Sequence, residues 1–115
     1  MSLTIYHNPR CSKSRQTLKL IEEAGAKVDI VLYLENLLSE AEITSLLQKL
    51  GFDSAKQLMR KGEAIYKELN LKVEVDETKL ITAMSKHPKL IERPIVVKND
   101  KAILGRPPEN VVTFL

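Results

Sequence analysis

The beginning of the chain holds the pattern that most restricts its fold: a strand, a helix and a second strand follow one another closely. Residues 3–6 form a short apolar stretch that ends at Asn8-Pro9, which is typical of a strand entering a loop. Residues 12–24 place apolar side chains at helical spacing before Gly25, and residues 27–34 alternate, with Val28, Ile30 and Leu32 on one face. This order predicts a βαβ unit with two parallel strands.

The middle of the chain is predicted to be helical. Ser39 and Glu42 match a capping box, and the apolar repeat that follows ends at Gly51. Two short helical segments are expected at residues 55–61 and 63–68, and Asp76 can cap a further helix.

The last part of the chain is predicted to form a hairpin and a final helix. Residues 95–98 and 101–104 are β-rich and are separated by Asn99-Asp100, a suitable two-residue turn. Pro107 and Pro108 can begin a helix over residues 109–115. The 115 residues are therefore expected to form a single α/β domain. Its four-stranded mixed sheet would be built as βαβ and then ββα, with a helical insertion at about residues 39–87.

Charge and hydropathy restrict the classes of function that this chain can have. Eighteen basic and fifteen acidic residues give a net charge of +3, an interspersed excess that argues against nucleic acid and suits a small anionic substrate. No apolar run is long enough to span a membrane, and no signal peptide is visible at the start. We therefore expect a cytoplasmic protein.

The chain has one cysteine, Cys11, located where the first strand passes into the first helix. The unpaired N–H groups and the positive dipole end of a helix favour a thiolate there, and Lys13 and Arg15 add positive charge. A lowered thiol pKa and a reactive cysteine are expected. The alternative is a buried structural thiol, which the polar neighbours of Cys11 make less favourable.

Two common cysteine motifs are absent. A C-x-x-C pair would need a second thiol where Ser14 stands, and the anion loop of cysteine phosphatases would need arginine at Thr17. With a single cysteine there is no internal disulfide and no zinc site built on cysteine pairs. Any disulfide of Cys11 must therefore form with a second molecule.

Arginine is scarce in this sequence, and two of the five arginines directly precede prolines. Arg93 stands before the predicted hairpin and Arg106 after it. Arginine binds tetrahedral oxyanions through a planar fork of donors, so these two could converge on a thiol at a neighbouring strand end. The alternative is that they are solvated surface residues.

Six segments together resemble the glutaredoxin-coupled arsenate reductases, a family with a thioredoxin-like fold. They are residues 6–15 (YHNPRCSKSR), 32–36 (LYLEN), 58–61 (LMRK), 87–88 (HP), 91–97 (IERPIVV) and 104–107 (LGRP). They occur in order and span nearly the whole chain.

The resemblance implies a site and a reaction. Cys11 would attack arsenate, and Arg60, Arg93 and Arg106 would hold the oxyanion. His7, Ser14, Arg15 and Pro94 would complete the substrate site: His7 supporting the thiolate, Ser14 supplying a hydroxyl, Arg15 following it, and Pro94 as a cis-proline facing the thiol. Glutathione would be the co-substrate and glutaredoxin the partner that resets the cysteine, with no bound cofactor and no metal.

Other functions stay open at this point. A thioredoxin-like regulatory or redox-sensing binding protein needs the thiol but not three oxyanion donors, and a single-thiol oxidoreductase would act on glutathionylated proteins. The complete set of Cys11, Arg60, Arg93 and Arg106 favours the arsenate reductase. For His7, a loop residue with local hydrogen bonds is an equal alternative.

Overall fold

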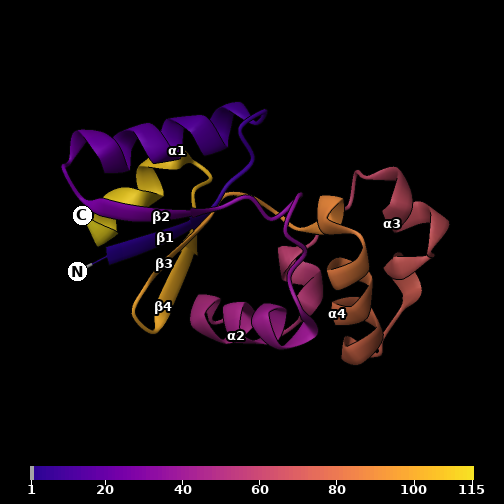
Figure 1. Cartoon of the computed structure of the whole chain (residues 1–115). Helices are drawn as coiled ribbons and strands as arrows, with labels where there is room; N and C mark the ends of the chain where they lie inside the picture. The colour runs from indigo at the N-terminus through magenta and orange to yellow at the C-terminus, as the bar shows by residue number, and fades with distance from the viewer. Residues whose placement is uncertain (1) are drawn as a thin grey trace. The chain divides into compact units, whose positions relative to one another are not determined.

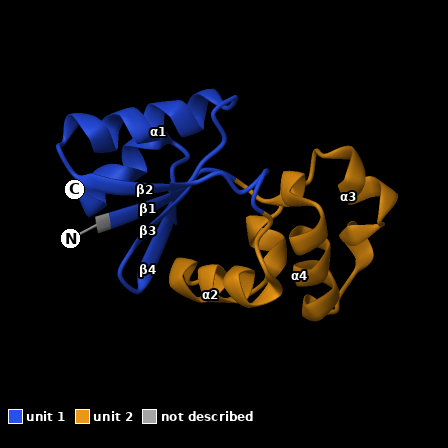
Figure 2. Cartoon of the chain, viewed as in Figure 1, with its two compact units in different colours: residues 1–36, 93–115 blue, residues 37–92 orange. Residues whose placement is uncertain are grey.

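The computed structural model describes residues 2–115, which form two compact units. One unit holds the residues up to Asn36 together with Arg93–Leu115, and the other is Leu37–Glu92 (Figure 2). The predicted insertion at residues 39–87 lies inside the second unit, whose bounds extend further on both sides. The description of the whole chain as one domain stays a prediction.

The first unit contains the predicted four-stranded mixed sheet. Its strands are β1 (Ser2–Tyr6), β2 (Lys27–Val31), β3 (Ile95–Lys98) and β4 (Lys101–Leu104), in the order β2-β1-β3-β4 (Figure 1). β1 pairs parallel with β2 and antiparallel with β3, and β3 and β4 form the antiparallel hairpin. The βαβ and ββα arrangement is confirmed.

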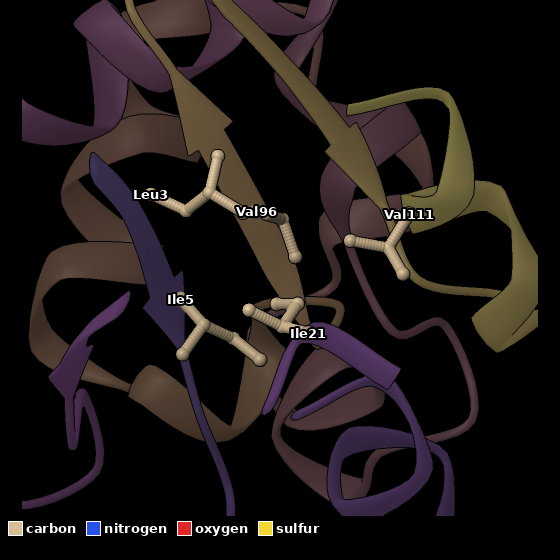
Figure 3. Close-up of a cluster of buried hydrophobic side chains, with 5 residues drawn as sticks. All are labelled: Leu3, Ile5, Ile21, Val96 and Val111. Atoms are coloured by element: carbon tan, nitrogen blue, oxygen red, sulfur yellow. The ribbon is translucent and has the colours of Figure 1, made fainter. Parts of the chain in front are cut away.

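One face of this sheet carries the core of the first unit. Leu3 and Ile5 of β1 and Val96 of β3 pack with Ile21 of α1 (Ser12–Glu23) and with Val111 of η4 (Pro108–Phe114), as Figure 3 shows. The apolar side of α1 and the final helical segment therefore cover the same face. This packing fixes α1 against the sheet, and Cys11 lies at the N-terminus of that helix.

Two details of the first unit differ from the sequence-based prediction. β2 ends at Val31, and Ile30 is 48% exposed, because β2 is an edge strand with only β1 beside it. The final segment, predicted as a helix over residues 109–115, is a 3₁₀ helix over Pro108–Phe114.

The second unit is helical, as predicted. Its elements are α2 (Glu40–Leu50), η1 (Ala55–Leu58), α3 (Ala64–Glu68), η2 (Leu71–Val73), α4 (Glu77–Lys86) and η3 (Pro88–Leu90). Ser39 and Glu42 form the predicted capping box of α2, and Gly51 ends that helix with a φ of 73°. Asp76 caps α4 by accepting a hydrogen bond from the Thr78 N–H.

Side-chain hydrogen bonds connect the helices of this unit. The Glu77 carboxylate accepts from Ser54 Oγ at 2.9 Å and from the Ala55 N–H at 2.7 Å, which joins the starts of α4 and η1. Thr82 Oγ1 donates to the Glu40 carboxylate at 2.9 Å, joining α4 to α2.

Candidate active site

Cys11 is the N-cap residue of α1 and ends the loop between β1 and α1, which is stabilised by hydrogen bonds. The Cys11 N–H donates to the Asn8 carbonyl at 3.0 Å, and its own carbonyl accepts the first helical bond, from Arg15. The Asn8 side chain accepts from the Arg10 N–H at 3.0 Å, and the Arg15 guanidinium donates to the Pro9 carbonyl at 2.9 Å. The loop therefore presents the thiol in a defined position at the helix N-terminus.

The surroundings of Cys11 lower the pKa of its thiol. Burial alone raises this pKa, since the side chain is only 8% exposed and the charged form loses hydration. That effect is outweighed by the Ser14 N–H, by the positive charge of Arg93, by the Lys13 N–H and by a hydrogen bond from the Arg93 side chain. All of these favour the thiolate, which is the nucleophilic form.

A buried pair, His7 and Ser14, lies behind the loop. Their Nδ1 and Oγ atoms are 2.6 Å apart, and Ser14 Oγ also accepts from the Asn8 N–H at 3.1 Å. Burial and the nearby positive charge of Arg15 lower the pKa of His7, and Glu22 opposes this only in part. The lowered pKa favours the neutral imidazole, which hydrogen-bonds locally with Ser14.

Pro94 joins the hairpin to the Cys11 helix. The Arg93–Pro94 peptide bond is cis, as the family resemblance implies. The Gly105 N–H donates to the Pro94 carbonyl at 2.9 Å, and the Gly105 carbonyl accepts from Thr17 Oγ1 of α1 at 3.3 Å. These two hydrogen bonds join the start of β3, the end of β4 and α1.

Arg93 and Arg106 lie together on the hairpin side of the site. Arg106 Nη1 donates to the Arg93 carbonyl at 3.3 Å, while the Arg93 side chain reaches the Cys11 sulfur. Arg106 precedes a second cis bond, Arg106–Pro107, which the sequence analysis did not predict. The structure therefore brings two of the three expected oxyanion arginines to the thiol side of the first unit.

Arg60 belongs to the second unit, where two carboxylates hold it. Its guanidinium pairs with Glu63 at 3.1 Å and with Glu92 at 3.9 Å. Its backbone N–H donates to the Leu90 carbonyl at 2.7 Å, beside the bridge between Met59 and Ile91. Its convergence with Cys11 stays a prediction, as does a substrate contact of Arg15.

Thr17 and Gly105 contribute to the site, although the sequence alone predicts no role for them. Thr17 is fully buried, and a β-carbon on Gly105 would stand 2.5 Å from Thr17 Oγ1 and 2.7 Å from Pro94 Cγ. Glycine is thus required at position 105 because Thr17 and Pro94 approach it closely, and no local pattern in the sequence reveals this.

The described residues 2–115 contain no group of three acidic, histidine or cysteine side chains suited to a metal ion, and no helix able to cross a membrane.

The comparison with protein families matches residues 6–114 to the ArsC family. The chain belongs to the ArsC family. The match includes the Cys11 loop, Arg60 and the hairpin arginines.

Similar proteins support this membership along the whole length. An arsenate reductase of Haemophilus influenzae is 49% identical, over 100% of both chains, and the Escherichia coli (strain K12) protein YfgD is 56% identical over 112 residues, covering 96% of this chain and 94% of its own. A solved arsenate reductase from Vibrio cholerae has a TM-score of 0.96 at 50% identity, over 100% of this chain and 98% of that one. The ArsC likeness confirms the predicted α/β, thioredoxin-like fold.

Proposed function

We propose that this ArsC protein reduces arsenate to arsenite with electrons from glutathione, through an arsenic–sulfur bond on Cys11, and that glutaredoxin restores the thiol. The observation that carries the proposal is the Cys11 thiol at the N-terminus of α1, whose pKa is lowered by backbone N–H groups and Arg93. The arsenate reductases among its relatives support arsenate as the oxyanion.

The first step uses the Cys11 thiolate as nucleophile. Its sulfur attacks arsenic, a sulfur–arsenic bond forms, and one arsenate oxygen leaves as water after taking up protons. Arsenic is still pentavalent at this stage, and negative charge stays on its remaining oxygens. The Arg93 guanidinium, already in contact with the sulfur, is positioned to neutralise that charge.

The second step transfers two electrons to arsenic. The glutathione thiolate attacks the Cys11 sulfur, and the sulfur–arsenic bond breaks with its electron pair staying on arsenic, which leaves as arsenite. Cys11 and glutathione are now joined in a mixed disulfide. The chain holds no second cysteine to open this bond, so a thiolate of glutaredoxin takes over the glutathione and frees Cys11. Such thiol partners favour a reducing compartment, in keeping with the cytoplasm.

The arginines and the buried pair receive different roles. We assign oxyanion binding to Arg93, Arg106 and Arg60, because a planar guanidinium matches the oxygens of a tetrahedral anion. His7 and Ser14 act as positioning residues, since their mutual hydrogen bond and the one to Asn8 hold the loop that carries the thiol.

The test is arsenite production from arsenate with glutathione and glutaredoxin, measured for the wild-type protein and for Cys11→Ser. The proposal expects arsenite only when the wild-type thiol and both thiol partners are present. Ser12→Ala is the matched control, because Ser12 is the exposed neighbour of Cys11. Arsenite production by Cys11→Ser at the wild-type rate would overturn the covalent step, and undiminished turnover without glutaredoxin would overturn the resetting step.

A further inference from the structure

The second unit contains a cavity whose lining is basic. Its volume is about 640 Å³, within the size range of small-molecule sites. It is lined by Lys56, Lys61, Lys67, Lys72, Tyr66 and Asn70. These residues come from η1, α3 and η2 and from the turns on either side of α3.

The lining ammonium groups have no carboxylate to balance them. The cavity wall contains no acidic side chain, and within residues 2–115 none of its four lysines forms an ion pair. Residues 56–72 carry five basic and two acidic side chains, so this short stretch holds a charge of +3, equal to that of the whole chain. Four like charges around one hollow favour the binding of an anion.

The cavity also contains a tyrosine hydroxyl. Tyr66 is only 7% exposed, and no hydrogen bond to its hydroxyl occurs in the described range 2–115. This hydroxyl can donate to and accept from a ligand atom in the cavity.

One lysine is already fixed in place. Lys56 Nζ donates to the Lys72 carbonyl at 2.9 Å, which ties η1 to η2 on one side of the hollow. An ammonium group ordered in this way loses less side-chain entropy on binding than a free one. The remaining lysines are exposed and can close around a ligand.

We propose that this cavity binds a small polyanion of the phosphate class, carrying two or more phosphate groups. Lysine is a point-charge ligand for phosphate, and several lysines match several charges better than one. A cavity of this volume is suited to binding a small, compact molecule rather than the flat surface of a partner protein. The inference is independent of the arsenate chemistry, because all the residues that carry it lie in the second unit.

The experiment is a titration of ¹⁵N-labelled protein at constant ionic strength, followed by amide chemical shifts. Sodium tripolyphosphate and ADP are the probes, and inorganic phosphate is the singly phosphorylated comparison. We expect saturable shifts at Lys67, Asn70 and Lys72 with both probes and much weaker binding of phosphate. Tripolyphosphate binding without ADP binding would assign the site to plain polyphosphates, and tighter binding of ADP would assign it to nucleotides.

Matched variants separate the site from unspecific attraction. Lys67→Gln/Lys72→Gln should weaken tripolyphosphate binding roughly tenfold, as expected for two lost charge-assisted contacts. The control Lys27→Gln/Lys89→Gln removes the same charge from exposed lysines outside the cavity and should change affinity less than about twofold. Tyr66→Phe, which keeps the ring, should weaken binding about threefold to tenfold.

Three results would overturn the proposal. They are the absence of saturable shifts at residues 61–72, equal losses in the lysine variant and its control, and shifts confined to Lys13 and Ser14 at the Cys11 site. None of these results bears on arsenate reduction, and the activity of Cys11→Ser does not bear on anion binding in the cavity. The two proposals can therefore fail separately.

Discussion

Gly105→Ala adds one methyl group at the most crowded contact around the candidate site. The new β-carbon would stand 2.5 Å from Thr17 Oγ1, 2.7 Å from Pro94 Cγ and 2.9 Å from Thr17 Cγ2. Thr17 is fully buried and lies on α1, and Pro94 is a buried ring residue, so neither neighbour is the end of a flexible side chain. The chain must shift to accept the methyl group.

The cost follows from overpacking. Forcing a methyl group into a filled site typically costs about 1–3 kcal/mol, and for a chain of this length that corresponds to a fall in Tm of about 4–12 °C. The shift also moves Pro94 and the preceding Arg93 away from the Cys11 sulfur. We therefore expect arsenate reduction to fall together with the free energy of unfolding.

Denaturant unfolding and thermal melting measure this effect. Gly62→Ala is the matched control, because a β-carbon at Gly62 would meet nothing within 4 Å and its φ is not positive. Combining Gly105→Ala with Thr17→Ala removes two of the three close contacts, so the double variant should lose less stability than the sum of the single variants. A Gly105→Ala protein as stable as the Gly62→Ala control, or strictly additive losses, would show that the Gly105 contacts are not tightly packed.

Three further predictions concern the site itself. Arg93→Lys and Arg106→Lys keep the charge but lose the planar fork, and steady-state kinetics should show kcat for arsenate falling by roughly 10²–10³. Ser14→Ala leaves buried groups without their partner, so it should lower the free energy of unfolding by about 1–3 kcal/mol, whereas Ser12→Ala at an exposed position should not. Mass spectrometry after arsenate and glutathione treatment should find one glutathione on Cys11, removable by glutaredoxin; no adduct under turnover would contradict the proposed second step.

Much of the fold was predictable because its elements carry strong local signals. The hairpin strands have the predicted bounds, since two apolar runs flank Asn99-Asp100, and Asn99 adopts a φ of 57° in that turn. The capping box at Ser39 and the left-handed Gly51 likewise mark both ends of α2. The predicted end of β2 was wrong because edge position and packing, rather than the alternation of apolar and polar residues, decide how far a strand extends.

The candidate site was only partly predictable. The place of Cys11 before a helix, and hence a lowered thiol pKa, follows from the order of elements alone. The contact between Thr17 and Gly105 joins residues 88 positions apart, so no local sequence pattern predicts it. The roles of His7, Ser14 and Arg60 came from family resemblance, because their spacing in the sequence specifies no chemistry.

The loop and Arg93 lower the pKa of the Cys11 thiol, and the pH dependence of its alkylation rate measures this effect. The rate rises with pH as the thiolate forms, so a lowered pKa places the inflection below the free value of about 8.5. Arg93→Gln should move the inflection upward, whereas Arg10→Gln, which removes an exposed charge next to Cys11, should move it less. Arg93→Gln is therefore expected to cause the larger shift of the two. An inflection at or above about 8.5 in the wild-type protein, as for an unperturbed thiol, would contradict the lowered pKa.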